Sequence, residues 1–206
     1  MVKPVYYKIK ECRICKNRKL KIIIDLNNQH IQGSFIKKNY PKPYLKKIPL
    51  QLVLCQKCSL VQLLHTTNKE ILYKNYWYES GINKTMKTHL KDLISNLCTI
   101  KKHEIKKIKV LDIGCNDGTL LNFYPKTVEK FGIDPSQITK KIDRKKIKVI
   151  KDFFPPRKNN LRNINVKFDL ITSIAMFYDL DNPNLFVKNI NNYLKSDGVW
   201  VFELSY

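Results

Sequence analysis

Two glycines placed four residues apart interrupt an apolar stretch, and this feature constrains the fold more than any other. Residues 108–113 form a short apolar run typical of a buried parallel strand. Gly114 and Gly118 follow it, and because neither has a Cβ, the backbone can turn sharply there and approach a ligand closely. A helix is predicted to begin beside this loop, where its first N–H groups are unpaired.

A second strand reinforces the prediction. The strand candidate 130–133 is followed by Asp134, sixteen positions after Gly118. Nucleotide-binding α/β domains hold ribose hydroxyls with an acidic side chain at such a strand end. The order strand, glycine loop, helix and strand ending in an acid therefore predicts a nucleoside-cofactor site.

The C-terminal half of the chain alternates strand and helix patterns. A helix is predicted over 183–194, followed by a turn at 196–198. Such alternation indicates βα units with right-handed crossovers, which build a parallel sheet. We therefore expect an α/β domain over residues 107–206, with about five parallel strands at 108–113, 130–133, 146–150, 168–174 and 198–204.

Four of the six cysteines are paired by spacing, as Cys12-x-x-Cys15 and Cys55-x-x-Cys58. In a cytosolic chain this arrangement indicates metal ligation rather than disulfides, and tetrahedral Zn²⁺ accepts four thiolates. The alternative is two unrelated pairs of buried thiols. A strand at 21–26 and a hairpin of 50–54 with 60–64 complete a small zinc-binding β module, which we place at residues 1–66.

Residues 67–106 form a predicted helical bridge between these domains. A short helix from Asn68 is interrupted by the aromatic segment 76–81, which could line a polar pocket or form an aromatic plug between domains. A second helix carries apolar residues at helical spacing. His89 lies beside this stripe, where a structural histidine is the more common occurrence.

The charge is strongly positive, with 39 Lys and Arg against 17 Asp and Glu and a net charge of +22. Such a field attracts nucleic acid or other anions. Only five of the basic residues are arginine, however, and the richness in Lys, Asn and Ile indicates an AT-rich genome. We therefore do not expect nucleic acid as the partner, although the charge suits an anionic substrate. No signal peptide or membrane-spanning run is visible, so a soluble, cytoplasmic protein without a membrane partner is expected.

Several motifs together resemble a known family. DIGCNDGTLL (112–121), GIDPS (132–136), KDFF (151–154) and FDLITSIAMFYDL (168–180) are similar to the successive motifs of class I S-adenosylmethionine-dependent methyltransferases. CRIC (12–15), CQKCSLVQLLH (55–65) and YWYESGINKTMKTH (76–89) resemble the zinc-containing sugar C-methyltransferases, which act on nucleotide-linked keto-deoxysugars. The resemblance implies a Rossmann-like methyltransferase sheet, a nucleotide-sugar substrate, and S-adenosylmethionine and zinc as cofactors.

The resemblance also implies roles for individual residues. The loop with Gly114, Asn116 and Gly118 would approach the methionyl end of the cofactor, although many methyltransferases carry glycine in place of Asn116. Turn-capping remains the alternative for the two acids that follow strands, Asp134 and Asp152. The remaining roles are Asp112 toward the cofactor ammonium group, Asp134 on the ribose, Asp152 and Phe153 on the adenine, and Tyr76, Tyr78, Ser80 and His89 on the substrate side.

One departure from the family bears on catalysis. In the resembled enzymes a further domain follows the Glu-x-x-Tyr strand, and its Tyr/Glu/His segment supplies the catalytic base. This chain ends at residues 202–206, so we expect an incomplete sheet, and either a separate C-terminal chain as partner or impaired turnover. The alternative function is that of a basic zinc protein binding nucleic acid, either as an RNA methyltransferase or as a non-catalytic partner subunit.

Overall fold

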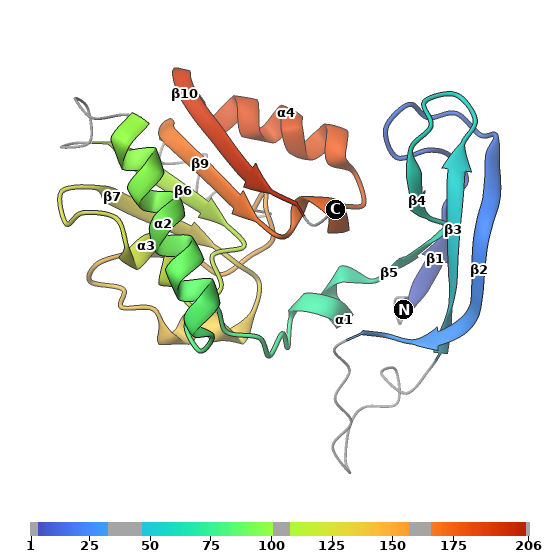
Figure 1. The fold of residues 1–206 in the computed structure, drawn as a ribbon, viewed down its shortest axis with the longest axis horizontal. Helices are drawn as coiled ribbons and strands as arrows, with labels where there is room; N and C mark the ends of the chain where they lie inside the picture. Colours follow the sequence, from blue (N-terminus) through green and yellow to red (C-terminus); the bar gives the residue numbers. More distant parts are fainter. Residues whose placement is uncertain (1–3, 33–46, 101–107, 157–165, 205–206) are drawn as a thin grey trace, which may run out of the picture. The chain divides into compact units, whose positions relative to one another are not determined.

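The computed structural model describes residues 4–32, 47–100, 108–156 and 166–204 (Figure 1). The chain divides into two compact units. The first comprises Met1–Asn75 with Asp181–Asn184, and the second comprises Tyr76–Leu180 with Leu185–Tyr206. Of the segments considered in the sequence, Ser205 and Tyr206 lie outside the described residues, as do the end of the predicted bridge and parts of both predicted flanking domains.

The first unit is built from antiparallel strands. β2 (Leu20–His30), β3 (Lys47–Cys55) and β4 (Val61–Leu63) form one sheet in that order. β1 (Tyr6–Lys8) pairs with β5 (His65–Thr67) in a second, two-stranded sheet. The predicted hairpin is the β3–β4 pair. A short helix, α1 (Lys69–Tyr73), follows, and the Asn68 side chain caps it by accepting a hydrogen bond from the Glu70 amide.

The second unit contains a five-stranded parallel sheet with the strand order β10-β9-β6-β7-β8. This confirms the predicted α/β class and the five parallel strands. The strands are β6 (Lys109–Ile113), β7 (Glu129–Ile133), β8 (Lys148–Ile150), β9 (Phe168–Ile174) and β10 (Leu194–Glu203). The predicted turn at 196–198 differs from the structure, because those residues lie within β10, where the register with β9 shifts between Leu194 and Val199.

Helices cover both faces of the parallel sheet (Figure 1). The buried face of α2 (Lys84–Ile100) packs with α3 (Thr119–Asn122) and with Val110 and Leu170 of the sheet. α4 (Pro183–Tyr193) packs against the opposite face, which presents Leu111 and Ile171. Successive residues of a strand point to opposite faces, so an almost continuous apolar run such as 110–113 supplies both cores.

Gly132, the last residue but one of β7, lets the loop after β6 pack directly on the sheet. A Cβ at Gly132 would lie 2.7 Å from Cys115 Sγ and 3.2 Å from Leu121 Cδ1. Real Cβ atoms essentially never come as near to another atom as 2.7 Å, and both neighbours are buried.

We therefore expect Gly132→Ala to lower the free energy of unfolding by about 1–3 kcal/mol, through overpacking. Denaturant unfolding followed by circular dichroism measures this loss. Adding Cys115→Ala removes the closest atom, so the double variant should lose less than the sum of the single losses. A Gly132→Ala protein as stable as the wild type would show that the loop does not pack as described.

Candidate functional site

The loop between β6 and α3 has a backbone that few side chains tolerate. Gly114 and Gly118 have φ of 79° and 77°, and Asn116 between them has φ of 52°. The amide of Gly114 donates to Ile133 O at 2.8 Å, so the loop folds back over the end of β7. Glycine adopts this left-handed region without cost, and asparagine does so more readily than most residues. Both predicted glycines are thus required by conformation.

Asp134 directly follows β7, and its carboxylate points toward this loop. Oδ2 accepts a hydrogen bond from the Asn116 amide at 3.0 Å, and Oδ1 accepts one from the Ser136 amide at 2.8 Å. The side chain is only 7% exposed. An ionised carboxylate has about four acceptor positions, so two remain for a ligand such as a ribose diol.

Asp112 lies within β6 and is buried, with 4% of its surface exposed. Thr172 on the neighbouring strand β9 donates its hydroxyl to Asp112 Oδ1 at 2.6 Å. Burial raises the pKa of Asp112 to about 7; the Thr172 hydrogen bond works against this rise, and the charge of Asp134 adds to it. A carboxyl group in this state gains from a cationic partner, which a ligand ammonium group would provide.

The three predicted acids lie on or after neighbouring strands of the sheet. Asp112 is on β6, Asp134 follows β7, and Asp152 follows β8. These three strands are adjacent, in the order β6-β7-β8. Asp152 and its neighbour Phe153 are half-buried, and Phe153 N donates to Asp152 Oδ1 at 2.8 Å. Parallel strands bring their carboxyl ends to one edge, where ligands of open α/β sheets bind.

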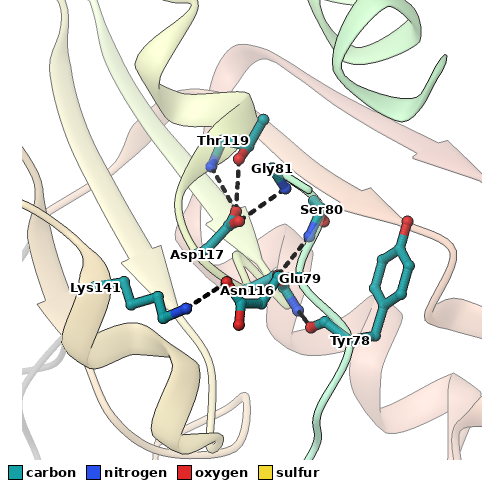
Figure 2. Close-up of polar contacts among 8 residues, drawn as sticks. All are labelled: Tyr78, Glu79, Ser80, Gly81, Asn116, Asp117, Thr119 and Lys141. Carbon is teal, nitrogen blue, oxygen red and sulfur yellow. Dashed lines mark hydrogen bonds and ion pairs between the residues drawn. The ribbon is translucent and has the colours of Figure 1, made fainter. Parts of the chain in front are cut away.

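The aromatic segment 76–81 is hydrogen-bonded to the glycine loop, as Figure 2 shows. Asn116 Nδ2 donates to Tyr78 O at 2.9 Å, and Asn116 Oδ1 accepts from the Ser80 amide at 3.0 Å. Tyr76 and Tyr78 have their ring centroids 6.4 Å apart, and burial raises the pKa of Tyr76. The structure therefore brings Tyr76, Tyr78 and Ser80 of the predicted substrate-side set close to the glycine loop.

His89, the remaining member of that set, is half-exposed on α2. Its Nε2 lies 2.6 Å from Oε2 of Glu203, the last residue of β10. Neither Glu203 nor Thr172, the partner of Asp112, was among the site residues predicted from the sequence. A polar residue inside an apolar strand was the available signal for Thr172, whereas no local pattern marks the pairing of His89 with a residue 114 positions away.

The four cysteines of the two Cys-x-x-Cys motifs converge in the first unit. All four Sγ atoms lie within 4.8 Å of one another, and the described residues contain no other such group of potential metal ligands. Cys12 and Cys58 are 3.7 Å apart, and Cys15 and Cys55 are 3.5 Å apart. Tetrahedral zinc with Zn–S bonds of about 2.3 Å needs sulfurs about 3.8 Å apart, so the cluster fits this ion.

Neighbouring donors also suit thiolate ligands. Gln62 Nε2 donates to Cys12 Sγ at 3.2 Å, and such outer hydrogen bonds orient metal ligands. Hydrogen bonds led by the Cys58 amide lower the pKa of Cys55 to about 6. For Cys58 the Leu60 amide lowers the pKa, but hydrogen bonds with the other thiols and burial raise it to about 12. A bound cation would favour the thiolate form of the ligands, because metal ligation requires a deprotonated sulfur.

Cys55→Ala should abolish the metal site, because it removes one of four ligands. We expect about one zinc per chain in the wild type and much less in the variant, measured by inductively coupled plasma mass spectrometry. Cys98→Ala is the matched control, since Cys98 lies on α2 outside the cluster. A wild-type protein purified without chelator that carries no zinc would contradict the assignment.

Several methyltransferases of known structure are similar to this chain. The plantazolicin methyltransferase BpumL in complex with SAH is 20% identical, with a TM-score of 0.46, over 56% of this chain and 46% of that one. An S-adenosylmethionine-dependent methyltransferase from Clostridium acetobutylicum ATCC 824 is 24% identical, with a TM-score of 0.44, over 56% and 49% of the two chains. The fold class itself rests on the strand order described above.

Among curated proteins, C-methyltransferase NovU of Streptomyces niveus is 23% identical over 133 residues. The match covers 63% of this chain and 31% of NovU. The chain therefore spans about a third of the length of this curated relative.

Two family models match the chain. One, described as "Putative zinc binding domain", covers residues 12–73 and contains all four clustered cysteines. The other, described as "Methyltransferase domain", covers residues 82–205, more than half of the chain. The two matches and the thiol cluster support the predicted cofactors, S-adenosylmethionine and zinc. No helix in the described parts of the chain is long and apolar enough to cross a membrane. The chain belongs to the methyltransferase-domain family.

Proposed function

We propose that this chain binds S-adenosylmethionine at the carboxyl edge of β6, β7 and β8 and transfers its methyl group to a carbon of a nucleotide-linked keto-deoxysugar. The observation that carries the donor half is the buried carboxyl group of Asp112, which has a hydroxyl partner and no cationic partner among the described residues. S-Adenosylmethionine presents both an ammonium group and a ribose diol. These are the two groups that Asp112 and Asp134 are suited to bind.

In this proposal each part of the donor site has one task. The glycine loop, with Gly114, Asn116 and Gly118, packs against the methionyl end of the donor. Asp134 uses its two remaining acceptor positions for the ribose hydroxyls. Asp152 accepts from the adenine amino group, and Phe153 packs on the ring. The placement of these residues after the adjacent strands β6, β7 and β8 supports the assignment of one part of the donor to each.

The acceptor half of the proposal rests on the segment beside the loop. Tyr76, Tyr78, Ser80 and His89 are the proposed substrate-side residues, and the similarity to NovU supports carbon methylation. A hollow of about 270 Å³ also lies next to this segment. Lys84, Lys87 and Lys91 line it together with Phe123, and none of the three has an ion pair with a described residue. Such a cationic hollow suits the diphosphate of a nucleotide-linked sugar.

The bound donor would supply a methyl group on a positively charged sulfur. A carbon next to the keto group loses a proton to a base, and its electron pair then forms the new C–C bond while the S–C bond breaks and the sulfur keeps that bond's electrons. The chain's own residues hold the two reactants in line, which is a large source of rate enhancement.

Binding of S-adenosylhomocysteine tests the donor site directly. Isothermal titration calorimetry should show about one site per chain in the wild type. Asp134→Asn should weaken binding about tenfold or more, because hydrogen bonds to a charged group contribute about 1.5–3 kcal/mol. Asp143→Asn is the matched control, since Asp143 is an exposed aspartate in the same unit. An absence of binding at millimolar ligand together with steeply salt-dependent RNA binding would favour the nucleic-acid alternative.

The raised pKa of Asp112 makes binding depend on pH in a defined direction. The free protein carries a mostly protonated Asp112 below about pH 7 and a charged one above it. A ligand ammonium group binds the charged form better, so affinity for S-adenosylhomocysteine should rise as pH increases from about 6 to about 8. Asp112→Asn should remove this dependence and weaken binding at pH 8. An affinity that falls over this range in the wild type would contradict the role of Asp112.

A further inference from the structure

Asn116 makes hydrogen bonds toward both proposed halves of the site. Its main-chain amide donates to Asp134 Oδ2 at 3.0 Å. Its side-chain amide uses both ends on the aromatic segment, donating to Tyr78 O at 2.9 Å and accepting from the Ser80 amide at 3.0 Å (Figure 2). The residue is 8% exposed, so water competes little for these bonds.

Two further contacts fasten the same segment. Asp117 Oδ2 accepts from the Gly81 amide at 2.8 Å, while its Oδ1 accepts from the amide and hydroxyl of Thr119 at the start of α3. Lys141 donates to Glu79 Oε2 at 2.6 Å (Figure 2). Every residue from 78 to 81 is thus bonded to the glycine loop or to the 3₁₀ helix Gln137–Lys141.

We propose that Asn116 is a positioning residue that couples the donor-binding acid Asp134 to the acceptor-side segment 78–81. The roles of the two sides rest on the proposed function; the hydrogen bonds themselves do not. A ligand that orders Asp134 also orders the Asn116 main chain, and the Asn116 side chain passes this order to Tyr78 and Ser80. Placement matters here because small errors between methyl donor and acceptor carbon reduce the rate strongly.

A simpler explanation is that asparagine is present only because it tolerates a positive φ. Glycine tolerates the same φ and keeps the main-chain amide that bonds Asp134, but it has no side chain. Asn116→Gly therefore separates the two explanations. Asn27→Gly is a closely matched control, because Asn27 has φ of 57° in strand β2 of the other unit.

The experiment is residue-resolved amide hydrogen exchange by NMR on the full, zinc-loaded chain, with and without S-adenosylhomocysteine. In the wild type the ligand should slow exchange of the Ser80 amide. In Asn116→Gly that amide should exchange at least about fivefold faster, in line with the loss of one hydrogen bond, and the ligand should no longer slow it. The affinity is measured alongside, and exchange is compared at saturating ligand in each protein, because Asn116 itself belongs to the glycine loop of the proposed donor site. Asn27→Gly should leave both measurements unchanged.

Two negative results are distinguishable. Failure of the wild type to bind S-adenosylhomocysteine contradicts the proposed function. Binding with the same Ser80 exchange in wild type and Asn116→Gly contradicts only the role of Asn116. If Asn116→Gly does not fold, Asn116→Asp replaces it: the carboxylate still accepts from the Ser80 amide, so the ligand should still slow exchange of this amide although the bond to Tyr78 O is lost. Loss of that slowing in Asn116→Asp would overturn the inference.

Discussion

Two carboxyl groups buried beside a sharply turning loop are the constraint on which the site depends. Asp112 and Asp134 are each less than 10% exposed, and neither is paired with a cationic side chain among the described residues. Burial of negative charge without a counter-charge costs free energy, and the raised pKa of Asp112 expresses that cost. Structural acids in cores are normally paired, so this arrangement is better explained by a cationic, hydroxyl-bearing ligand that completes it.

The thiol cluster of the first unit follows the same principle. Four Sγ atoms converge within 4.8 Å, and the hydrogen bonds among them and from nearby amides move the pKa values of Cys55 and Cys58 in opposite directions. A zinc ion among the four sulfurs would stabilise them as thiolates and would tie together segments more than 40 residues apart in sequence. In both units, the groups whose charged forms are unfavourable in the protein alone are the groups suited to binding a cation or a cationic ligand.

Much of this architecture could be predicted from sequence because it depends on local patterns. Apolar runs located the strands, and the Cys-x-x-Cys spacing identified the four cysteines that cluster. The residues at which helices and strands begin and end were harder to predict. α3 is only four residues long, since Pro125 disfavours helical backbone at the residue before it. β10 begins at Leu194, because the residues of the expected turn lie at an irregularity in the pairing of β10 with β9. The partners of site residues could not be predicted, because Thr172 with Asp112, and Glu203 with His89, meet only through the strand order.

The central claim is that the loop and acids at the carboxyl edge of the sheet bind a methyl-donor nucleoside. A crystal structure of the chain with S-adenosylhomocysteine tests it most directly. We expect the ligand's ammonium nitrogen within about 3.2 Å of Asp112 and its ribose hydroxyls within about 3.0 Å of Asp134. Electron density for the nucleoside at another place, with both carboxylates unchanged and without ligand contacts, would contradict it.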